Sequence, residues 1–336
     1  MNCWYTQSAA EDDIVISSRI RLARNLNKIP FPGRMNTADY DRVNELVKEA
    51  ITNSNTPFSK SLKFLFMKDV PENERYAMVE RHIVSKEFVS NCENKAIILS
   101  EDESVCVMLG EEDHIRIQVI LPGLQIEAAY DIAENIDRLL CDSLDIAFDD
   151  NLGFLTGCPT NLGTGLRASV MLHLPILEAS GEMTSLSESI SKIGFTVRGM
   201  YGEGTRADAC IYQLSNQITL GISEKNAIDN LKIITTQILD KERTKRNSIN
   251  RIKAEDTCMR ALGILKYARI LDSNEMMKYL SDIKLGMSIG IISNDDIKPI
   301  KLLVEGQPFM LMRKFGEMSP TERDIYRANL VRHALP

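Results

Sequence analysis

The sequence predicts an α+β protein in which a sheet with covering helices is followed by a helical domain. Between residues 12 and 222, short β-branched runs alternate with amphipathic stretches that have helical spacing. After Glu224 the strand signals fade, and the chain is rich in helix formers without Gly or Pro until Gly263. The length of 336 residues allows two domains. We therefore expect one domain over residues 1–245 and a second over 246–336.

The expected strands are short apolar and β-branched runs. They cover residues 13–23, 62–67, 96–100, 105–109, 115–121, 195–199, 208–215 and 217–221. Between them we expect helices over 37–51, 71–88 and 124–144, because Thr37 is a candidate N-cap, Pro71 and acidic residues open the second, and apolar residues recur at helical spacing in the third. The basic stretch 241–250 is either a linker or the solvated face of a continuous helix.

Composition excludes several classes of protein. The formal charge of −7 argues against a general nucleic-acid binder, so any anion site must be a local concentration of positive charge. The chain shows neither a signal peptide nor a membrane span, and we expect a cytoplasmic protein. Its seven scattered cysteines indicate reduced thiols and no metal site.

Arg19 and Arg21 lie two residues apart inside a β-branched run. Alternate side chains of a strand share a face, so both guanidinium groups are expected on one side, with Ile20 and Leu22 on the other. Two like charges side by side repel unless an anion lies between them. The alternative is a solvated strand with its polar side outward.

The segment 110–121 places three acids before a strand that carries Arg116. Glu111, Glu112 and Asp113 precede His114, and a carboxylate held near arginines stays ionised and can accept a proton. This makes the segment a candidate for a catalytic base. The alternative is an acidic turn before a strand.

The loop "GCPTNLGTGLRASV", residues 157–170, is rich in glycine but is not a P-loop, because Leu166 and Arg167 follow Gly165. If it holds phosphate, it does so with an arginine. Cys158 is either a thiol activated by nearby arginines or a small buried side chain. The structural alternative for the loop is an ordinary turn.

The segment 195–216 contains a strand that ends near Arg198 and a glycine-rich loop with Glu203 at its tip. Such a loop could close over a ligand, or it could be a hairpin with a flexible polar loop. Five arginines are each expected on or beside a strand and near a loop: Arg19, Arg21, Arg116, Arg167 and Arg198. Five cations facing one place would suit a nucleoside triphosphate.

Four segments, 17–25, 111–116, 158–168 and 198–216, resemble the successive active-site motifs of the phosphagen (guanidino) kinases, in that family's order. Within the family the chain is most similar to the McsB-type protein-arginine kinases, and the likeness extends to "ERDIYRA" at 322–328. The resemblance implies a catalytic domain with a mainly antiparallel sheet flanked by helices, then a helical domain that dimerises. It also implies ATP as substrate, with Mg²⁺ held mostly by the nucleotide.

The resemblance assigns roles to single residues. Glu112 matches the catalytic carboxylate, Glu203 the loop acid that holds the substrate guanidinium, and His82 a position near the nucleotide. The five arginines match those that bind the ATP phosphates and the transferred group. The matching nucleotide-binding positions are Ser18, Arg19, Ile20, Arg21, Leu22, His82, Arg116, Arg167, Ala168, Ser169, Val170, Met171, Arg198, Gly199, Met200, Tyr201, Gly202 and Glu203.

The resemblance also bears on the acceptor. Creatine and arginine kinases carry a small helical N-terminal domain, whereas the first arginine strand begins near residue 14 here, so we expect an open site that takes an arginine of a protein. Arg323, Asp324 and Arg327 match a motif that recognises phosphoarginine; the alternative is a helix with charge pairing. Implied partners are an McsA-type zinc-binding activator, a CtsR-type stress-gene repressor and a ClpC-type unfoldase.

Two other functions stay open from the sequence. The first is a phosphagen kinase that acts on a free guanidino metabolite. The second is an inactive adaptor that binds phosphoarginine through its C-terminal part, although the presence of Glu112 and all five arginines argues against it.

Overall fold

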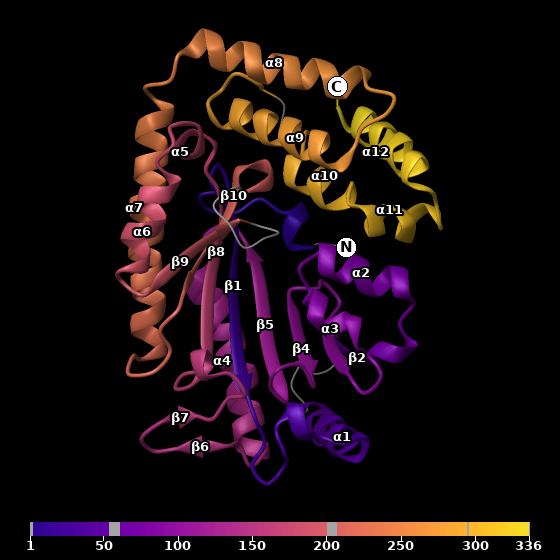
Figure 1. Cartoon of the computed structure of the whole chain (residues 1–336), viewed down its shortest axis with the longest axis vertical. Helices are drawn as coiled ribbons and strands as arrows, with labels where there is room; N and C mark the ends of the chain where they lie inside the picture. Colours follow the sequence, from indigo (N-terminus) through magenta and orange to yellow (C-terminus); the bar gives the residue numbers. More distant parts are fainter. Residues whose placement is uncertain (1–2, 54–60, 200–206, 294–295, 336) are drawn as a thin grey trace.

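The computed structural model describes residues 3–53, 61–199, 207–293 and 296–335 of the chain. Within these residues, eight strands form one sheet in the order β2-β3-β4-β5-β1-β8-β10-β9, and every neighbouring pair is antiparallel (Figure 1). The strands are β1 (Val15–Arg24), β2 (Leu62–Phe66), β3 (Ala96–Ser100), β4 (Val105–Leu109), β5 (Ile115–Pro122), β8 (Leu166–His173), β9 (Phe195–Gly199) and β10 (Ile211–Asn216). The short strands β6 (Phe148–Asp149) and β7 (Gly153–Phe154) form a separate hairpin.

Helices lie against the sheet and beyond one of its ends. They are α1 (Thr37–Asn53), α2 (Glu72–Glu80), α3 (Lys86–Ser90), α4 (Ile126–Ser143), α5 (Pro175–Ala179), α6 (Met183–Ser191), α7 (Glu224–Arg246), α8 (Arg251–Tyr267), α9 (Ser273–Ser288), α10 (Pro299–Glu305), α11 (Pro308–Phe315) and α12 (Pro320–Ala334). Helices α8 to α12 gather at one end of the sheet, above it in Figure 1. Single 3-10 turns are η1 (Trp4–Thr6), η2 (Pro32–Arg34), η4 (Met67–Asp69), η5 (Pro159–Asn161) and η6 (Asp208–Cys210).

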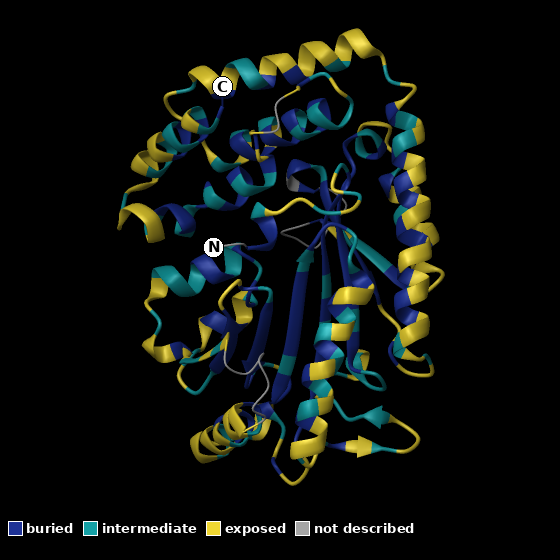
Figure 2. Ribbon diagram, turned by 180° about the vertical axis from the view of Figure 1, so that it is seen from behind, coloured by how far each residue is buried: buried dark blue, intermediate teal, exposed yellow. Residues whose placement is uncertain are grey.

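The main hydrophobic core lies on one face of the sheet. Ile20 and Leu22 of β1 pack there with residues of α1, α4 and α7, and Figure 2 shows α4 crossing this face. The apolar positions of α4 fall at helical spacing, so the helix buries one side and exposes the other. This face of the sheet is therefore dry and filled with side chains.

The opposite face of the sheet is covered only in part. One apolar cluster, with Met108 and Phe88, joins strands β3 and β4 to α2 and α3. A second cluster, with Ile120 and Met171, joins one end of the sheet to the C-terminal helices. Between the two clusters, the middle of strands β5, β1 and β8 carries polar side chains instead. Four of the five predicted arginines lie on these strands: Arg19, Arg21, Arg116 and Arg167.

Helices α2 and α11 hold the two parts of the chain together. The rings of Tyr76 and Phe309 stack with their centroids 4.7 Å apart. Glu80 at the end of α2 accepts hydrogen bonds from the backbone N–H groups of Phe309 (3.0 Å) and Met310 (2.7 Å) at the start of α11. A carboxylate at this position also interacts favourably with the helix dipole.

The titration of Glu80 gives a testable pH dependence. Burial raises the pKa of Glu80 from 4.5 to about 7, although the two N–H donors and Arg81 lower it. The folded protein binds the proton of the Glu80 carboxyl group more tightly than the unfolded chain does. Protonated Glu80 therefore adds to the free energy of unfolding at low pH, and this contribution is lost as the pH rises from about 5 to 7. We expect the wild type to lose about 1–2 kcal/mol of unfolding free energy relative to Glu80→Gln between about pH 5 and pH 8 in urea titrations. Parallel stability curves for the two proteins would contradict this.

The predicted fold class is confirmed, and most predicted elements have their counterparts. The expected helix over 71–88 is wrong as one helix: α2 ends at Glu80 and α3 begins at Lys86. The carbonyl of Arg81 accepts from Trp4 Nε1, and those of His82 and Ile83 accept from Gln118 Nε2, so tertiary hydrogen bonds replace the helical ones. His82 itself has a φ of 60°.

Two strand predictions also need correction. Residues 217–221 are not a strand, because Thr219 Oγ1 donates to the carbonyls of Thr160 (3.0 Å) and Leu162 (2.7 Å) and packs this segment on the glycine loop. The start of the run 208–215 is a 3-10 turn, and strand β10 begins at Ile211. The glycine loop leads directly into strand β8.

The basic stretch 241–250 is divided between helix and turn. Helix α7 continues to Arg246, residues 247–249 form a turn, and Asn250 caps α8 through its side chain.

No helix among the described residues is long and apolar enough to cross a membrane. All seven cysteines are free thiols.

Candidate active site

The strand register places all five predicted arginines on one face of the sheet. Arg21 of β1 lies directly opposite Arg167 of β8, and its neighbour Ala23 lies opposite Arg116 of β5. Arg198 of β9 lies directly opposite Gln213 of β10. The amide oxygen of Gln213 accepts a hydrogen bond from Arg19, so Gln213 connects the two arginines across the face. Since paired residues in a sheet share a face, the side chains of Arg19, Arg21, Arg116, Arg167 and Arg198 project to the same side. We call this surface the arginine face.

The arginine face carries more positive than negative charge. Glu111 and Glu112 both pair with Arg116, and the other four arginines form no ion pair among the described residues. The Nε atoms of Arg21 and Arg167 are buried without a hydrogen-bond acceptor among the described residues. Burial lowers the pKa of Arg21, and the neighbouring Arg19, Arg116 and Arg167 lower it further. The pKa of Arg167 is lowered by burial, then by Arg198 and Arg116. Guanidinium groups stay protonated in proteins, so the lowered pKa values indicate crowded positive charge, which a bound anion would relieve.

His82 lies at the edge of the arginine face. Its backbone carbonyl accepts a hydrogen bond from Gln118 Nε2 at 2.8 Å, which ties the turn after α2 to strand β5. Burial and the charge of Arg19 lower the pKa of His82 to about 3. The imidazole is therefore neutral at physiological pH and adds no further positive charge.

Glu112 is the acid at the edge of this face. Its carboxylate Oε2 lies 3.3 Å from Arg116 Nη2 and accepts a hydrogen bond of 3.4 Å from Asn161 Nδ2. The side chain is 46% exposed, so the carboxylate can meet a ligand that approaches from solvent. Glu111, in contrast, is held by Arg116 and by the hydroxyl of Ser85 (2.6 Å). Of the two adjacent acids, Glu112 is the one available for chemistry.

The turn that carries Glu112 is fixed by its next two residues, which the sequence did not single out as positioning groups. Oδ1 of the fully buried Asp113 accepts from Asn25 Nδ2 and from the backbone N–H of Gly157, each at 2.6 Å. His114 Nδ1 accepts from the N–H of Leu26 at 2.9 Å, and its Nε2 donates to the carbonyl of Pro30 at 2.8 Å. These bonds join strand β1, the acidic turn and the glycine loop. A Cβ on Gly157 would lie 2.6 Å from the carbonyl oxygen of Glu112, so the loop can approach this closely only with glycine.

Asp113→Ala is expected to weaken both the fold and the reaction. The loss of Oδ1 leaves the donors of Asn25 and Gly157 unpaired in the interior, which costs about 2–3 kcal/mol of unfolding free energy. Because Glu112 then loses its fixed position, we expect kcat to fall about tenfold while the KM for ATP changes little. Asp113→Asn keeps one acceptor oxygen and should recover part of both losses. An alanine variant equal to the wild type in urea unfolding and in kcat would contradict this role.

The other predicted nucleotide-binding positions divide between the two faces. The side chains of Ser169 and Met171 share the arginine face, whereas Ala168 and Val170 pack in the main core. Ile20 and Leu22 also belong to that core, and Ser18 Oγ donates to the carbonyl of Gly123 at 2.8 Å. Gly199 ends strand β9, and Met200, Tyr201, Gly202 and Glu203 lie outside the described residues.

Cys158 lies in the glycine loop, close in sequence to the residue of that loop that contacts Glu112. The thiol is partly buried, and its Sγ lies 3.0 Å from Thr160 Oγ1. Asn161, two residues later, is the residue that contacts Glu112. The candidate thiol and the candidate base are therefore on adjoining loops.

The proposed phosphoarginine residues are far along the chain on α12, away from the arginine face. Arg327 is only 1% exposed and donates to the carbonyls of Gly306 (2.7 Å) and Leu271 (2.8 Å) and to Asp324 Oδ1 (2.5 Å). Arg323 is partly buried, and its Nη1 lies 4.0 Å from Met312 Sδ. In this arrangement Arg327 joins α12 to the end of α10 and to the start of α9.

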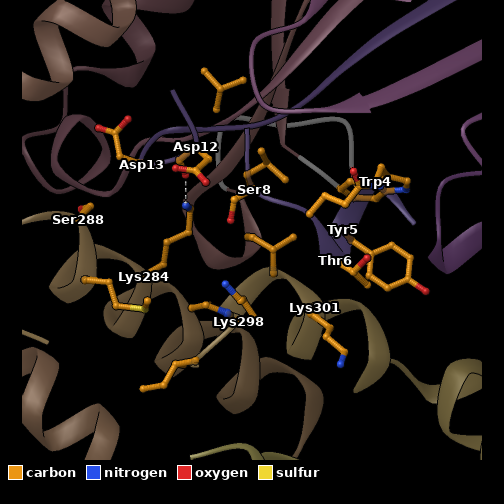
Figure 3. A pocket seen from close by; sticks show the side chains of 17 residues that line it. Trp4, Tyr5, Thr6, Ser8, Asp12, Asp13, Lys284, Ser288, Lys298 and Lys301 are labelled. Carbon is orange, nitrogen blue, oxygen red and sulfur yellow. Dashed lines mark hydrogen bonds between the residues drawn. The ribbon is translucent and has the colours of Figure 1, made fainter. Parts of the chain in front are cut away.

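Two cavities are relevant to ligands. One, of about 590 Å³, lies beside Glu112 and is lined in part by residues 31–34. The other, of about 340 Å³, lies between the N-terminal segment and helices α9 and α10 (Figure 3). There Lys284 donates a hydrogen bond of 2.6 Å to the carbonyl of Asp12, and none of the five arginines is among the described residues that line it.

Two family profiles match consecutive parts of the chain. The profile described as "ATP:guanido phosphotransferase, C-terminal catalytic domain" matches residues 42–245. The profile described as "Protein-arginine kinase McsB C-terminal domain" matches residues 251–336. The first covers the sheet except strand β1, which carries Arg19 and Arg21, and the second covers helices α8 to α12.

Relatives of similar length carry the same description. The protein-arginine kinase of Caldanaerobacter subterraneus subsp. tengcongensis is 44% identical over 325 residues, which are 96% of this chain and 96% of the relative. The protein-arginine kinase of Halothermothrix orenii is 44% identical over 337 residues, 99% of this chain and 96% of the relative.

Solved structures share the fold of the sheet region. The duplicated taurocyamine kinase from Schistosoma mansoni, solved with transition-state-analogue components, matches 70% of this chain with a TM-score of 0.62 and 27% identity. The match spans only 34% of that duplicated protein. Lombricine kinase matches 73% of this chain, and 71% of its own, with a TM-score of 0.62 and 20% identity, which supports the fold alone.

Proposed function

The chain belongs to the ATP:guanido phosphotransferase family, and within it to the protein-arginine kinases, so we propose that it transfers the γ-phosphoryl group of ATP to a guanidino nitrogen of arginine residues in proteins. The observation that carries this proposal is the arginine face with Glu112 at its edge. Phosphoryl transfer needs little covalent help from the protein and much electrostatic stabilisation of the phosphates. Five guanidinium groups on rigid strands would supply that stabilisation.

The arginines bind and orient the nucleotide. Arg21 and Arg167 offer buried N–H donors without acceptors among the described residues, and phosphate oxygens would satisfy them. Such donors, fixed before the substrate binds, need no rearrangement during the reaction. Mg²⁺, when bound with the nucleotide, would neutralise part of the phosphate charge.

Glu112 acts on the acceptor. A protonated guanidinium has a pKa above about 12 and no nitrogen lone pair available for attack, so a carboxylate must take a proton from it. The exposed carboxylate of Glu112 can receive that proton as the nitrogen bonds to the γ-phosphorus and ADP leaves. The resemblance gives Glu203, outside the described residues, the task of holding the same guanidinium. The product is a phosphoramidate on arginine.

The relatives favour a protein as acceptor. The profile that matches residues 251–336 and the relatives at 44% identity are all described as protein-arginine kinases. The alternative, a kinase of a free guanidino metabolite, is favoured by the likeness to taurocyamine kinase at 27% identity. A catalytically inactive adaptor is the third possibility, and Glu112 with its complete set of arginines opposes it.

The biological setting is proposed from the resemblance. The kinase would act in the cytoplasm during stress and mark proteins for degradation by a Clp protease. An McsA-type activator, a CtsR-type repressor and a ClpC-type unfoldase would be its partners. Residues 246–336 would form the domain of a homodimer, and Arg323, Asp324 and Arg327 would bind phosphoarginine and regulate the kinase allosterically. Arg327 would then have to exchange its present backbone carbonyl partners for the ligand.

One assay separates the three functions. The purified protein is incubated with Mg-ATP and either an unfolded basic protein or free arginine, and acid-labile phosphate is measured on each. We expect phosphate on arginine residues of the protein. Label on free arginine alone would favour the metabolite kinase, and no transfer to either, even with an activator present, would favour the adaptor.

A further inference from the structure

Glu112 faces a second space besides the arginine face. The cavity of about 590 Å³ has Phe31, Pro32, Arg34 and Tyr40 on one side and Glu111, Glu112 and Gly157 on the other. It opens to solvent, and none of the five nucleotide-binding arginines is among the described residues that line it. A ligand that occupies it would therefore touch the catalytic acid from the side away from the phosphates. We call this cavity the acceptor hollow.

The walls of the acceptor hollow are held in place by specific contacts. His114 donates to the carbonyl of Pro30, and its ring meets that of Phe31 edge to face at 6.0 Å. The hydroxyl of Tyr40 donates to the carbonyl of Pro32 at 3.2 Å. Gly110 has a φ of 78°, and a Cβ there would lie 2.7 Å from the Tyr40 ring, so the acidic turn can lie against this ring only with glycine. The hollow is thus built by the same segment that positions Glu112.

Two basic and two acidic side chains line the hollow, and they differ in their partners. Glu111 is already paired with Arg116. Lys95 donates to the carbonyls of Phe88 (3.2 Å) and Glu87 (3.4 Å), which hold its ammonium group at the rim. Arg34 is exposed and has no carboxylate partner among the described residues. Of the charged side chains that line the hollow, Arg34 is therefore the one without a polar partner among the described residues.

We propose that the acceptor hollow is the subsite for the polypeptide next to its target arginine, and that Arg34 selects substrates by pairing with an acidic side chain beside that arginine. The inference rests on the proposed function. A target guanidinium at Glu112 brings its flanking residues within a few times 3.5 Å of the same wall, because this is the spacing of residues along a chain. A free guanidino metabolite has no such flanking residues. The unpaired guanidinium of Arg34 is complementary to a carboxylate and repels a lysine or arginine at that position.

The test uses peptides with one arginine in a Gly/Ser background, flanked on both sides by Asp, Asn or Lys. The full-length protein with Mg-ATP, and with its activator if one is required, is assayed for kcat and KM on each peptide. For the wild type we expect kcat/KM to be about threefold to tenfold higher with Asp than with Lys, mainly through KM, since a partly exposed ion pair contributes about this much. The KM for ATP should be the same with every peptide.

Charge reversal at Arg34 and at a distant arginine distinguishes a local contact from net charge. Arg34→Glu should reverse the preference to Lys, while the KM for ATP stays unchanged. Arg138→Glu is the control, because it changes the net charge by the same amount. Arg138 belongs to α4, which covers the other face of the sheet (Figure 2). The Arg138→Glu variant should therefore keep the preference for Asp.

Each outcome has a distinct meaning. Equal kcat/KM for all flanks in the wild type, or an Arg34→Glu variant that still prefers Asp, would overturn the role of Arg34 and leave the proposed function standing. If the wild type transfers phosphate to free arginine but to none of the peptides, the proposed function fails and the subsite fails with it.

Discussion

Glu112→Gln is expected to lower kcat for phosphoryl transfer by about a thousandfold, since a positioned general base contributes roughly 10²–10⁴ to a rate. The amide has nearly the same shape and can keep a hydrogen bond, but it cannot take the proton of the guanidinium. ATP affinity should stay close to that of the wild type, because in the proposed arrangement the phosphates contact the arginines and not Glu112. The measurement is steady-state phosphorylation of an arginine-containing protein, together with calorimetric titration of ATP.

Glu101→Gln is a suitable control for the loss of a carboxylate. Glu101 is exposed and pairs with Lys63 on the far edge of the sheet, so this variant should keep the wild-type kcat. A Glu112→Gln protein with more than about a tenth of the wild-type kcat would show that another group removes the proton.

Arg21→Met is expected to abolish useful ATP turnover and at the same time to stabilise the nucleotide-free protein. Loss of one preorganised donor to the phosphates costs about 10²–10³ in kcat/KM. Without nucleotide, however, Arg21 is a partly buried cation among other cations, and its buried Nε has no acceptor among the described residues. A methionine of similar length removes the repulsion between the cations and the unpaired Nε donor. It should therefore raise the free energy of unfolding by about 1–2 kcal/mol.

Arg24→Met is the matched control from the same strand. Arg24 is fully buried, whereas Arg21 is only partly so. Arg24 forms a bidentate pair with Asp137 at 2.8 and 2.7 Å and donates to the carbonyls of Ala23 and Thr164. Its removal leaves a carboxylate without its partner, and we expect a loss of about 3 kcal/mol. Thermal unfolding without nucleotide should therefore change in opposite directions for the two substitutions. Equal destabilisation by both would contradict the view that the arginine face is built for an anion.

Nucleotide provides a second comparison. Saturating Mg-ATP should stabilise the wild type by mass action, whereas Arg21→Met should show little additional stability under the same conditions. If the variant gains as much stability as the wild type, Arg21 does not contact the nucleotide.

The sequence predicted the arginine face because its signal is local. The alternation of β1 separates Arg19 and Arg21 from Ile20 and Leu22, and the register confirms that the first pair shares a face while the second packs in the core. The fold class and the family were equally accessible, since they rest on ordered segments of the chain. The role of each arginine toward ATP remains a proposal.

The contacts that position Glu112 could not be predicted in the same way. Asp113 meets Asn25 and Gly157, which are 88 and 44 residues away in the sequence. The break after α2 depends on Trp4 and Gln118, whose side chains donate to the backbone carbonyls that a continuous helix would have used. Such partners are chosen by tertiary packing, and local propensity carries no information about them.

Arg34 shows a third kind of limit. In the sequence it is one more exposed arginine before a helix, and no motif sets it apart. Only the structure shows that it lines the same cavity as Glu112, which is 78 positions later in the chain. Its proposed part in substrate choice is therefore an inference from geometry.

The central claim is that side chains from separate strands surround one triphosphate opposite Glu112. A crystal structure of the protein with a Mg²⁺–nucleotide complex tests this most directly. We expect the phosphates on the arginine face, in contact with Arg21, Arg116 and Arg167, and the terminal phosphate nearest Glu112. Phosphates bound elsewhere, for example at Lys284 in the cavity of Figure 3, with the arginine face occupied only by solvent, would contradict it.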